Sequence, residues 1–181
     1  MSESSTSSQS VLTPDEKATP VMACTASCMV WGDVITKEVI RVSTWLRTAM
    51  VPDRIHFLNA RWLLFTSGSS MKPMFFKELY LPTVQINVFH LIPPAKDPLD
   101  YDPAEPNRKM EPITALVGSV RVDGNLRIAV KSDLARYLDS AHEAFSSIYD
   151  AEVSYPSLPV LGSVRVPLVL VRMTNANYAV R

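Results

Sequence analysis

The feature that most constrains the fold is a series of short apolar segments that recurs in the second half of the chain. Four segments between residues 30 and 86 are followed, in the same order, by four similar segments between residues 116 and 171. Because the order is kept and only the loops differ in length, the pattern predicts an internal duplication. The aligned pairs are Gly32 with Gly118, Ile40 with Ile128, Ala60 with Ala151, and Pro82 with Pro167.

Each copy has the pattern of β-strands. In "VRVDGNLRIAV" (120–130), apolar residues alternate on both sides of Asp123-Gly124, which predicts a tight hairpin with a positive φ at the turn. The first copy is expected to form the same hairpin around 36–38. As strands, the stretches "RWLLF" (61–65) and "PLVLV" (167–171) would have apolar residues on both faces, so both faces should be covered.

A short helical segment should follow each predicted hairpin. Ser43 or Thr44 in the first copy, and Ser132 in the second, can cap such a turn. Leu46 and Leu134 would then point inward. The second copy continues as "SDLARYLDSAHEAF" and can support a longer helix.

Composition divides the chain into four parts. Residues 1–20 are rich in Ser and Thr and predict a disordered tail, and 93–112 are rich in Pro and acidic residues and predict a surface strap anchored by Leu99, Tyr101 and Met110. The two β units are 21–92 and 113–181. Units this small are only marginally stable alone, so they should share one core. The predicted fold is mainly β: two tandem, small barrel-like or sandwich-like units related by duplication, with one or two short helices.

The charge balance argues against long-range attraction to polyanions. Eighteen basic residues match 18 acidic residues, giving a formal net charge of zero. A neutral protein is not drawn to nucleic acid or anionic lipid and has little repulsion against its own kind. The chain shows no secretory signal and no apolar run of membrane-spanning length, so a cytoplasmic location without membrane contact is expected.

The sequence predicts no catalytic residues, no metal site and no cofactor. Cys24 and Cys28 lack a second pair of ligands, and His56, His90 and His142 show no metal-binding spacing. His90 is expected to be a partly buried histidine with a backbone partner. No nucleophile elbow or phosphate-binding loop is present. An enzyme whose catalytic residues converge from distant positions stays open as an alternative.

A nucleic-acid or small-ligand binding module is a second alternative. Four arginines recur at intervals near Trp45, Phe57 and Trp62, and an arginine–aromatic surface can stack bases. The candidate contacts are Arg41, Arg47, Arg54 and Arg61. The weak net charge of each unit argues against this reading.

The favoured interpretation is a non-enzymatic interaction or assembly protein. The segment 71–82, "MKPMFFKELYLP", is interpreted as a loop in which methionine and aromatic residues gather. Such residues are enriched at protein interfaces, and packing of the same side chains into the core is the alternative. The protein is expected to associate with itself or with another protein through this segment and an adjacent strand edge. The candidate interface residues are Met71, Met74, Phe75, Phe76 and Tyr80.

Overall fold

The computed structural model describes residues 12–65 and 72–181, and in these residues one antiparallel sheet of ten strands dominates the fold. The strand order is β10-β6-β7-β8-β9-β5-β1-β2-β3-β4. The first half holds β1 (Glu16–Cys24), β2 (Cys28–Lys37), β3 (Arg54–Leu64), β4 (Met74–Pro82) and β5 (Val88–Leu91). The second half holds β6 (Arg108–Val117), β7 (Val120–Ala129), β8 (Phe145–Ser154), β9 (Ser163–Arg172) and β10 (Asn177–Val180).

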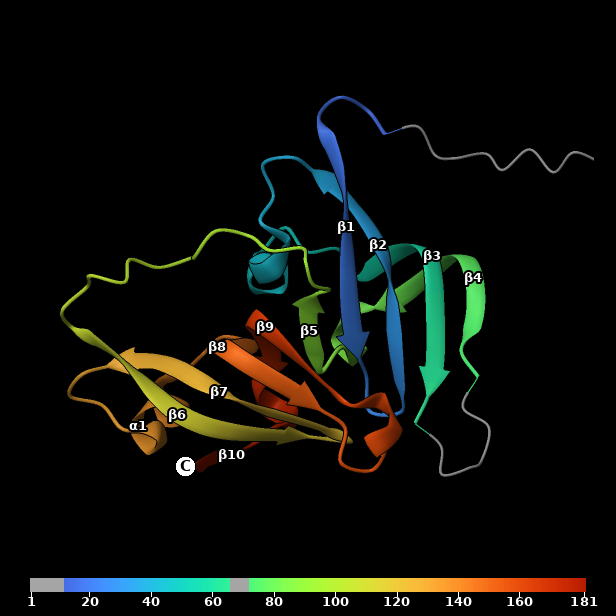
Figure 1. Cartoon of the computed structure of the whole chain (residues 1–181). Coiled ribbons are helices and arrows are strands. Elements are labelled where there is room, and N and C mark those ends of the chain that lie inside the picture. The colour runs from blue at the N-terminus through green and yellow to red at the C-terminus, as the bar shows by residue number, and fades with distance from the viewer. Residues whose placement is uncertain (1–11, 66–71) are drawn as a thin grey trace, which may run out of the picture.

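The mainly β prediction is confirmed, and the barrel-like prediction is wrong. The sheet stays open, with β4 at one end and β10 at the other (Figure 1). The reason lies at the centre of the sheet. The fifth strand of the first half does not close onto its own β4 but pairs with β9 of the second half.

The two halves have the same internal strand order. In each half, four strands follow one another as antiparallel neighbours, and a short fifth strand returns to pair with the first. Thus β5 pairs with β1, and β10 pairs with β6. A three-residue 3₁₀ turn precedes each fifth strand: η2 (Thr83–Gln85) and η4 (Met173–Asn175).

Local backbone features also correspond between the halves. The pairing of β2 with β3 shifts register at Gly32, and that of β7 with β8 shifts at Gly124. On the facing strands, Asn59 and Asp150 have positive φ angles of 49° and 47°. A Cβ added at Gly32 would lie 3.1 Å from the Cα of Ala60, and one added at Gly124 would lie 3.2 Å from the Cα of Ala151.

The observed strand positions show that three of the four aligned pairs are wrong. Gly118 forms the turn between β6 and β7 with φ 57°, so it does not correspond to Gly32 in the middle of β2. Ile40 lies outside the strands while Ile128 lies in β7, and Pro82 ends β4 while Pro167 lies within β9. Ala60 and Ala151 do occupy matching places. The apolar pattern is too short to fix register, because shifts by two residues preserve it.

The predicted hairpins are also misplaced. Asp123 and Gly124 lie inside the continuous strand β7, and Gly124 has no positive φ. Residues 36 and 37 are the last two of β2, and the chain then continues to a helix instead of turning directly into a second strand. The chain turns earlier, at 25–27 and at 118–119, so the strands on both sides of Asp123-Gly124 are one strand.

The predicted helical segments are present. The 3₁₀ helix η1 (Val42–Arg47) follows β2, and the helix α1 (Leu134–Ser140) follows β7. Asp133, rather than Ser132, caps α1 by accepting a 2.9 Å hydrogen bond from the Arg136 amide. Leu46 and Leu134 are buried, as predicted. A further 3₁₀ turn, η3 (Pro159–Leu161), precedes β9.

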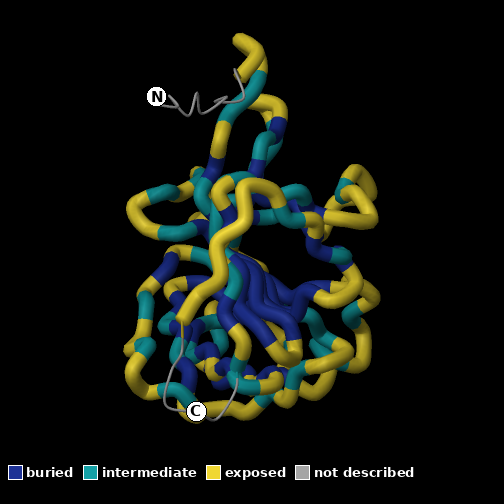
Figure 2. Tube along the Cα trace, turned by 90° about the vertical axis from the view of Figure 1, so that its right-hand side faces the viewer, coloured by how far each residue is buried: buried dark blue, intermediate teal, exposed yellow. Residues whose placement is uncertain are grey.

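The core consists of two clusters instead of one shared core. One is built mainly from the second half but includes Cys24, Met29, Leu63 and Val88 of the first. The other is built mainly from the first half but includes Phe145 and Leu170 of the second. Figure 2 shows the buried strands stacked in the interior, with exposed loops around them. The clusters therefore interlock at the junction of β5 and β9. Val169, Leu170 and Val171 of "PLVLV" are buried there, so both faces of this part are covered, whereas Pro167 and Leu64 of "RWLLF" are exposed.

The connector lies along the surface as an ordered strap. Residues 93–107 contain no helix or strand, and β6 begins at Arg108, so the end of the predicted connector belongs to the sheet. Tyr101 anchors it by packing edge-on against Tyr149, with ring centroids 4.8 Å apart, and beneath the guanidinium of Arg127. The other two predicted anchors, Leu99 and Met110, are exposed. At the start of the chain, β1 begins at Glu16 and so includes residues 16–20 of the predicted tail. Residues 1–11 of that tail lie outside the described residues.

Candidate functional site

The strand β4 is the candidate site because it ends the sheet with one side unpaired. It pairs with β3 along its length, from Met74 opposite Trp62 to Pro82 opposite Arg54. No strand of the described residues pairs with its other side. The segment predicted as a loop is therefore a nine-residue edge strand. Unpaired edges of this length offer a template for strand addition.

The side chains of β4 are unusually apolar for an exposed strand. Phe75 is 65% exposed and Tyr80 is 56% exposed, while Met74 and Phe76 are also exposed. Phe75 lies opposite Arg61, and Phe76 lies opposite Ala60. Four of the five predicted interface residues thus lie together on one edge, and the fifth, Met71, lies outside the described residues.

A polar cluster orders one end of this edge. The Tyr80 ring stacks on His56 with centroids 4.3 Å apart and planes 7° from parallel. Glu78 accepts hydrogen bonds from the Tyr80 hydroxyl at 3.0 Å and from the His56 ring at 3.1 Å. The bond to Glu78 raises the pKa of Tyr80. These contacts hold Tyr80 in one orientation at the surface.

The other end of the sheet is the short strand β10. It pairs with β6 from Asn177 opposite Leu116 to Val180 opposite Ile113. Tyr178 is half-buried and its hydroxyl lies 2.7 Å from Ser146 Oγ. Val180 is exposed. Sequence reasoning missed this strand, since "NYAV" is too short to show alternation.

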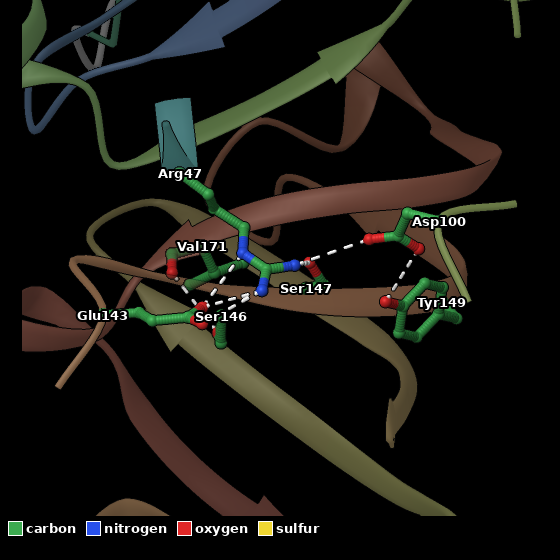
Figure 3. Close-up of polar contacts among 7 residues, drawn as sticks. All are labelled: Arg47, Asp100, Glu143, Ser146, Ser147, Tyr149 and Val171. Atoms are coloured by element: carbon green, nitrogen blue, oxygen red, sulfur yellow. Dashed lines mark hydrogen bonds and ion pairs between the residues drawn. The ribbon is translucent and has the colours of Figure 1, made fainter. Parts of the chain in front are cut away.

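Between these ends, a network of side chains ties the two halves together (Figure 3). Arg47 of η1 donates from Nε and Nη2 to the two carboxylate oxygens of Glu143, at 2.9 and 3.1 Å. Its Nη1 donates to Ser147 on β8 at 2.7 Å and lies 3.4 Å from Asp100 of the strap. Asp100 also accepts a 3.0 Å bond from the Tyr149 hydroxyl. Burial, followed by the charge of Asp100, raises the pKa of Tyr149 to about 12.

The four arginines proposed as nucleic-acid contacts do not form one free surface. Arg47 is paired with carboxylates of the second half and of the strap, as described above, and Arg41 is half-buried. Arg54 and Arg61 are exposed, at the start and in the second half of β3. Only Arg61 lies beside the β4 aromatic residues. The structure thus separates the four arginines whose spacing suggested one arginine–aromatic surface.

A cleft of about 530 Å³ lies beside the strap, between α1 and β8. Its basic residues Arg47, Arg108 and Arg127 line the walls. Each of them is paired with a carboxylate: Arg108 and Arg127 with Glu105, and Arg47 with Glu143. Arg47 also lies 3.4 Å from Asp100, so three carboxylates match the three guanidinium groups and balance their charge.

The remaining side chains that could be reactive, His90, Cys24 and Cys28, are buried in the core. His90 is buried in β5, with Nδ1 2.8 Å from the carbonyl oxygen of Leu91. Cys24 and Cys28 are free, buried thiols, and burial raises the pKa of Cys24 to about 12. Within 12–65 and 72–181, no three His, Cys, Asp or Glu side chains are grouped to hold a metal ion.

Comparison of the chain with models of protein families, with curated proteins and with solved structures finds no match. In the part of the chain that the structure describes, the helices are too short or too polar to cross a membrane.

Proposed function

We propose that this protein is a non-enzymatic assembly subunit or scaffold that associates through the edge strand β4. The observation that carries the proposal is the combination of an unpaired nine-residue strand and exposed Met74, Phe75, Phe76 and Tyr80 on it. Natural sheets shorten, charge or cover such edges. An edge left long and aromatic is typical of a surface that a partner covers.

The charge of the protein supports this proposal. The formal net charge is zero, so no long-range repulsion opposes contact between copies. The aromatic and methionine side chains would supply the apolar contact area of an interface, while the β4 backbone groups that point away from β3, such as those of Tyr80, would supply hydrogen bonds.

The proposal also treats the two halves as copies of one five-stranded unit. Support comes from their common strand order and from the matching of Gly32 with Gly124 and of Asn59 with Asp150. In such a protein the chain itself contains one strand pairing between units, that of β5 with β9. Association between chains would repeat the kind of strand pairing that joins the two halves within one chain.

The test replaces Phe75 and Phe76 together by Ser. Both side chains are exposed, so the variant should keep its melting temperature while its assembly weakens. Mass in solution is measured by light scattering across a range of concentrations. The control replaces Val39 and Val160 by Ser, because these residues are at least as exposed but lie away from β4. A Phe variant that assembles like the wild type would refute the proposal, and one that unfolds would place both rings in the core.

A further inference from the structure

The pairing of β5 with β9 gives a template for how two chains could join. Val88, Phe89 and His90 lie opposite Val171, Leu170 and Val169, and all six residues are buried. The backbone amide of Arg172 donates to the Asn87 carbonyl at 2.8 Å. The Arg172 side chain adds bonds to the carbonyl oxygens of Ile86 and Thr83, each 2.7 Å long. The fifth strand of the first half, β5, thus pairs with the fourth strand of the second half, β9.

The matching landmarks of the two halves identify the residues that correspond to this junction. Ala60 pairs with Phe76, and its counterpart Ala151 pairs with Val166. Counting along the strands from these pairs, Leu79, Tyr80 and Leu81 of β4 correspond to Val169, Leu170 and Val171 of β9.

The same procedure places β10. Gly32 lies opposite Val21 and Gly124 opposite Ile113, so Ala23 corresponds to Ala115. Ala23 pairs with Phe89, and Ala115 pairs with Tyr178. Tyr178 of β10 therefore corresponds to Phe89 of β5, with Asn177 and Ala179 beside it. Within the chain, Phe89 lies opposite Leu170, so the equivalent contact between chains sets Tyr178 opposite Tyr80.

The backbone groups of these two tyrosines face outward. In an antiparallel pair, residues alternate between those whose N–H and C=O bond the neighbouring strand and those that point away. Thr83 donates to Asp53 on the β3 side at 2.9 Å, and Tyr80 lies three residues before it, so the Tyr80 amide points away from β3. Arg181 donates to Pro112 on the β6 side at 3.4 Å, and Tyr178 lies three residues before it. The Tyr178 amide therefore points away from β6.

We propose that β4 of one chain pairs antiparallel with β10 of a second copy of this chain, with Tyr80 opposite Tyr178 in a hydrogen-bonded pair. This inference rests on the proposed function and names its partner. Leu81 would lie opposite Asn177, and Leu79 opposite Ala179. The contact is head-to-tail, so each added chain carries one further free β4 or β10 until the assembly closes as a ring.

One feature of β4 weakens the pairing in this register. The residue that corresponds to Arg172 is Pro82, which has no amide hydrogen and so omits the bond that Arg172 makes to Asn87. Proline is tolerated in edge strands where its missing N–H would face away from the paired neighbour. Pro82 is in that orientation, because it is two residues from Tyr80. The contact between chains would therefore be weaker than the junction within a chain.

Disulfide trapping tests the register. One chain carries Leu79→Cys and a second carries Ala179→Cys. These residues would form a non-hydrogen-bonded pair with Cα atoms about 4.5 Å apart, close enough for a disulfide. The chains are mixed, oxidised with oxidised glutathione and separated under denaturing, non-reducing conditions. Cys24 and Cys28 are buried, so they should not compete.

The expected result is a covalent dimer in the mixture, and its loss when either chain is oxidised alone. The matched control combines Tyr80→Cys with Ala179→Cys, since a shift of one residue turns the thiol to the opposite face of the strand. A mixture that assembles by light scattering but gives no more dimer than this control would overturn the pairing and leave the proposed function standing. Chains that remain monomeric and form no disulfide would overturn both.

Discussion

Replacing Gly124 by Ala should destabilise the protein, although alanine ordinarily stabilises a strand relative to glycine. A Cβ built at Gly124 would lie 2.6 Å from Cγ2 of Ile148 and 2.9 Å from the carbonyl oxygen of Tyr149. Non-bonded heavy atoms pack best at roughly 3.5–4.0 Å, so β7 and β8 would have to separate by about 0.5–1 Å. The Ile148 side chain can rotate, but the Tyr149 carbonyl is part of the backbone.

The expected cost is about 1–3 kcal/mol of unfolding free energy, as for other overpacked sites. Each kcal/mol lowers the melting temperature by about 2–4 °C in a chain of this size. The assay is thermal and urea unfolding followed by circular dichroism. Without the close approach, Gly→Ala would instead stabilise by about 0.4–1 kcal/mol, because it restricts the unfolded chain.

Asparagine separates this explanation from the hairpin interpretation. A turn glycine with positive φ tolerates Asn, whereas a glycine in close contact does not. Gly124→Asn should therefore be at least as destabilising as Gly124→Ala. The matched control is Gly118→Asn, at the turn with φ 57°, which should be tolerated. A Gly124→Ala variant at least as stable as the wild type would refute the close-approach account.

Three further predictions concern the network, the buried histidine and the edge. Arg47→Ala should lower the unfolding free energy by about 1–2 kcal/mol in urea titrations, since it leaves Asp100 without its ion pair between the halves. Burial lowers the pKa of His90, so stability should fall by up to about 1.4 kcal/mol per pH unit as the pH drops below about 6.5. His90→Leu should flatten this slope between pH 6.5 and 5, and the control His142→Gln should not. Tyr80→Pro should reduce the mass in solution more than Tyr80→Ala, because only proline removes the outward amide.

The sequence predicted the elements with clear local patterns and missed those that depend on distant contacts. Apolar alternation located β7, and the Pro-rich composition located the strap with its anchor Tyr101. The dipeptide Asp123-Gly124 predicted a turn because it is a common local hairpin signal. Here the glycine is required by the approach of β8, which no local pattern records.

The candidate site shows the same division. The aromatic and methionine content of 71–82 suggested Phe75, Phe76 and Tyr80 as interface residues, and all three side chains are exposed. It did not show that they belong to an edge strand, because pairing with β3 and the absence of a partner on the other side are properties of the whole sheet. The arginine spacing misled for a related reason: Arg47 lies on a 3₁₀ helix that faces the second half, where carboxylates bind it.

The most direct test of the central claim is the mass of the wild-type protein in solution, measured by light scattering as its concentration is varied. Assembly through β4 predicts a species that is a whole-number multiple of the 20.1 kDa chain and that disappears in the Phe75/Phe76 serine variant. A wild type that keeps the mass of a single chain at every concentration, and whose Tyr80 amide, which points away from β3, exchanges its hydrogen freely in cell extract as well as in buffer, would contradict it.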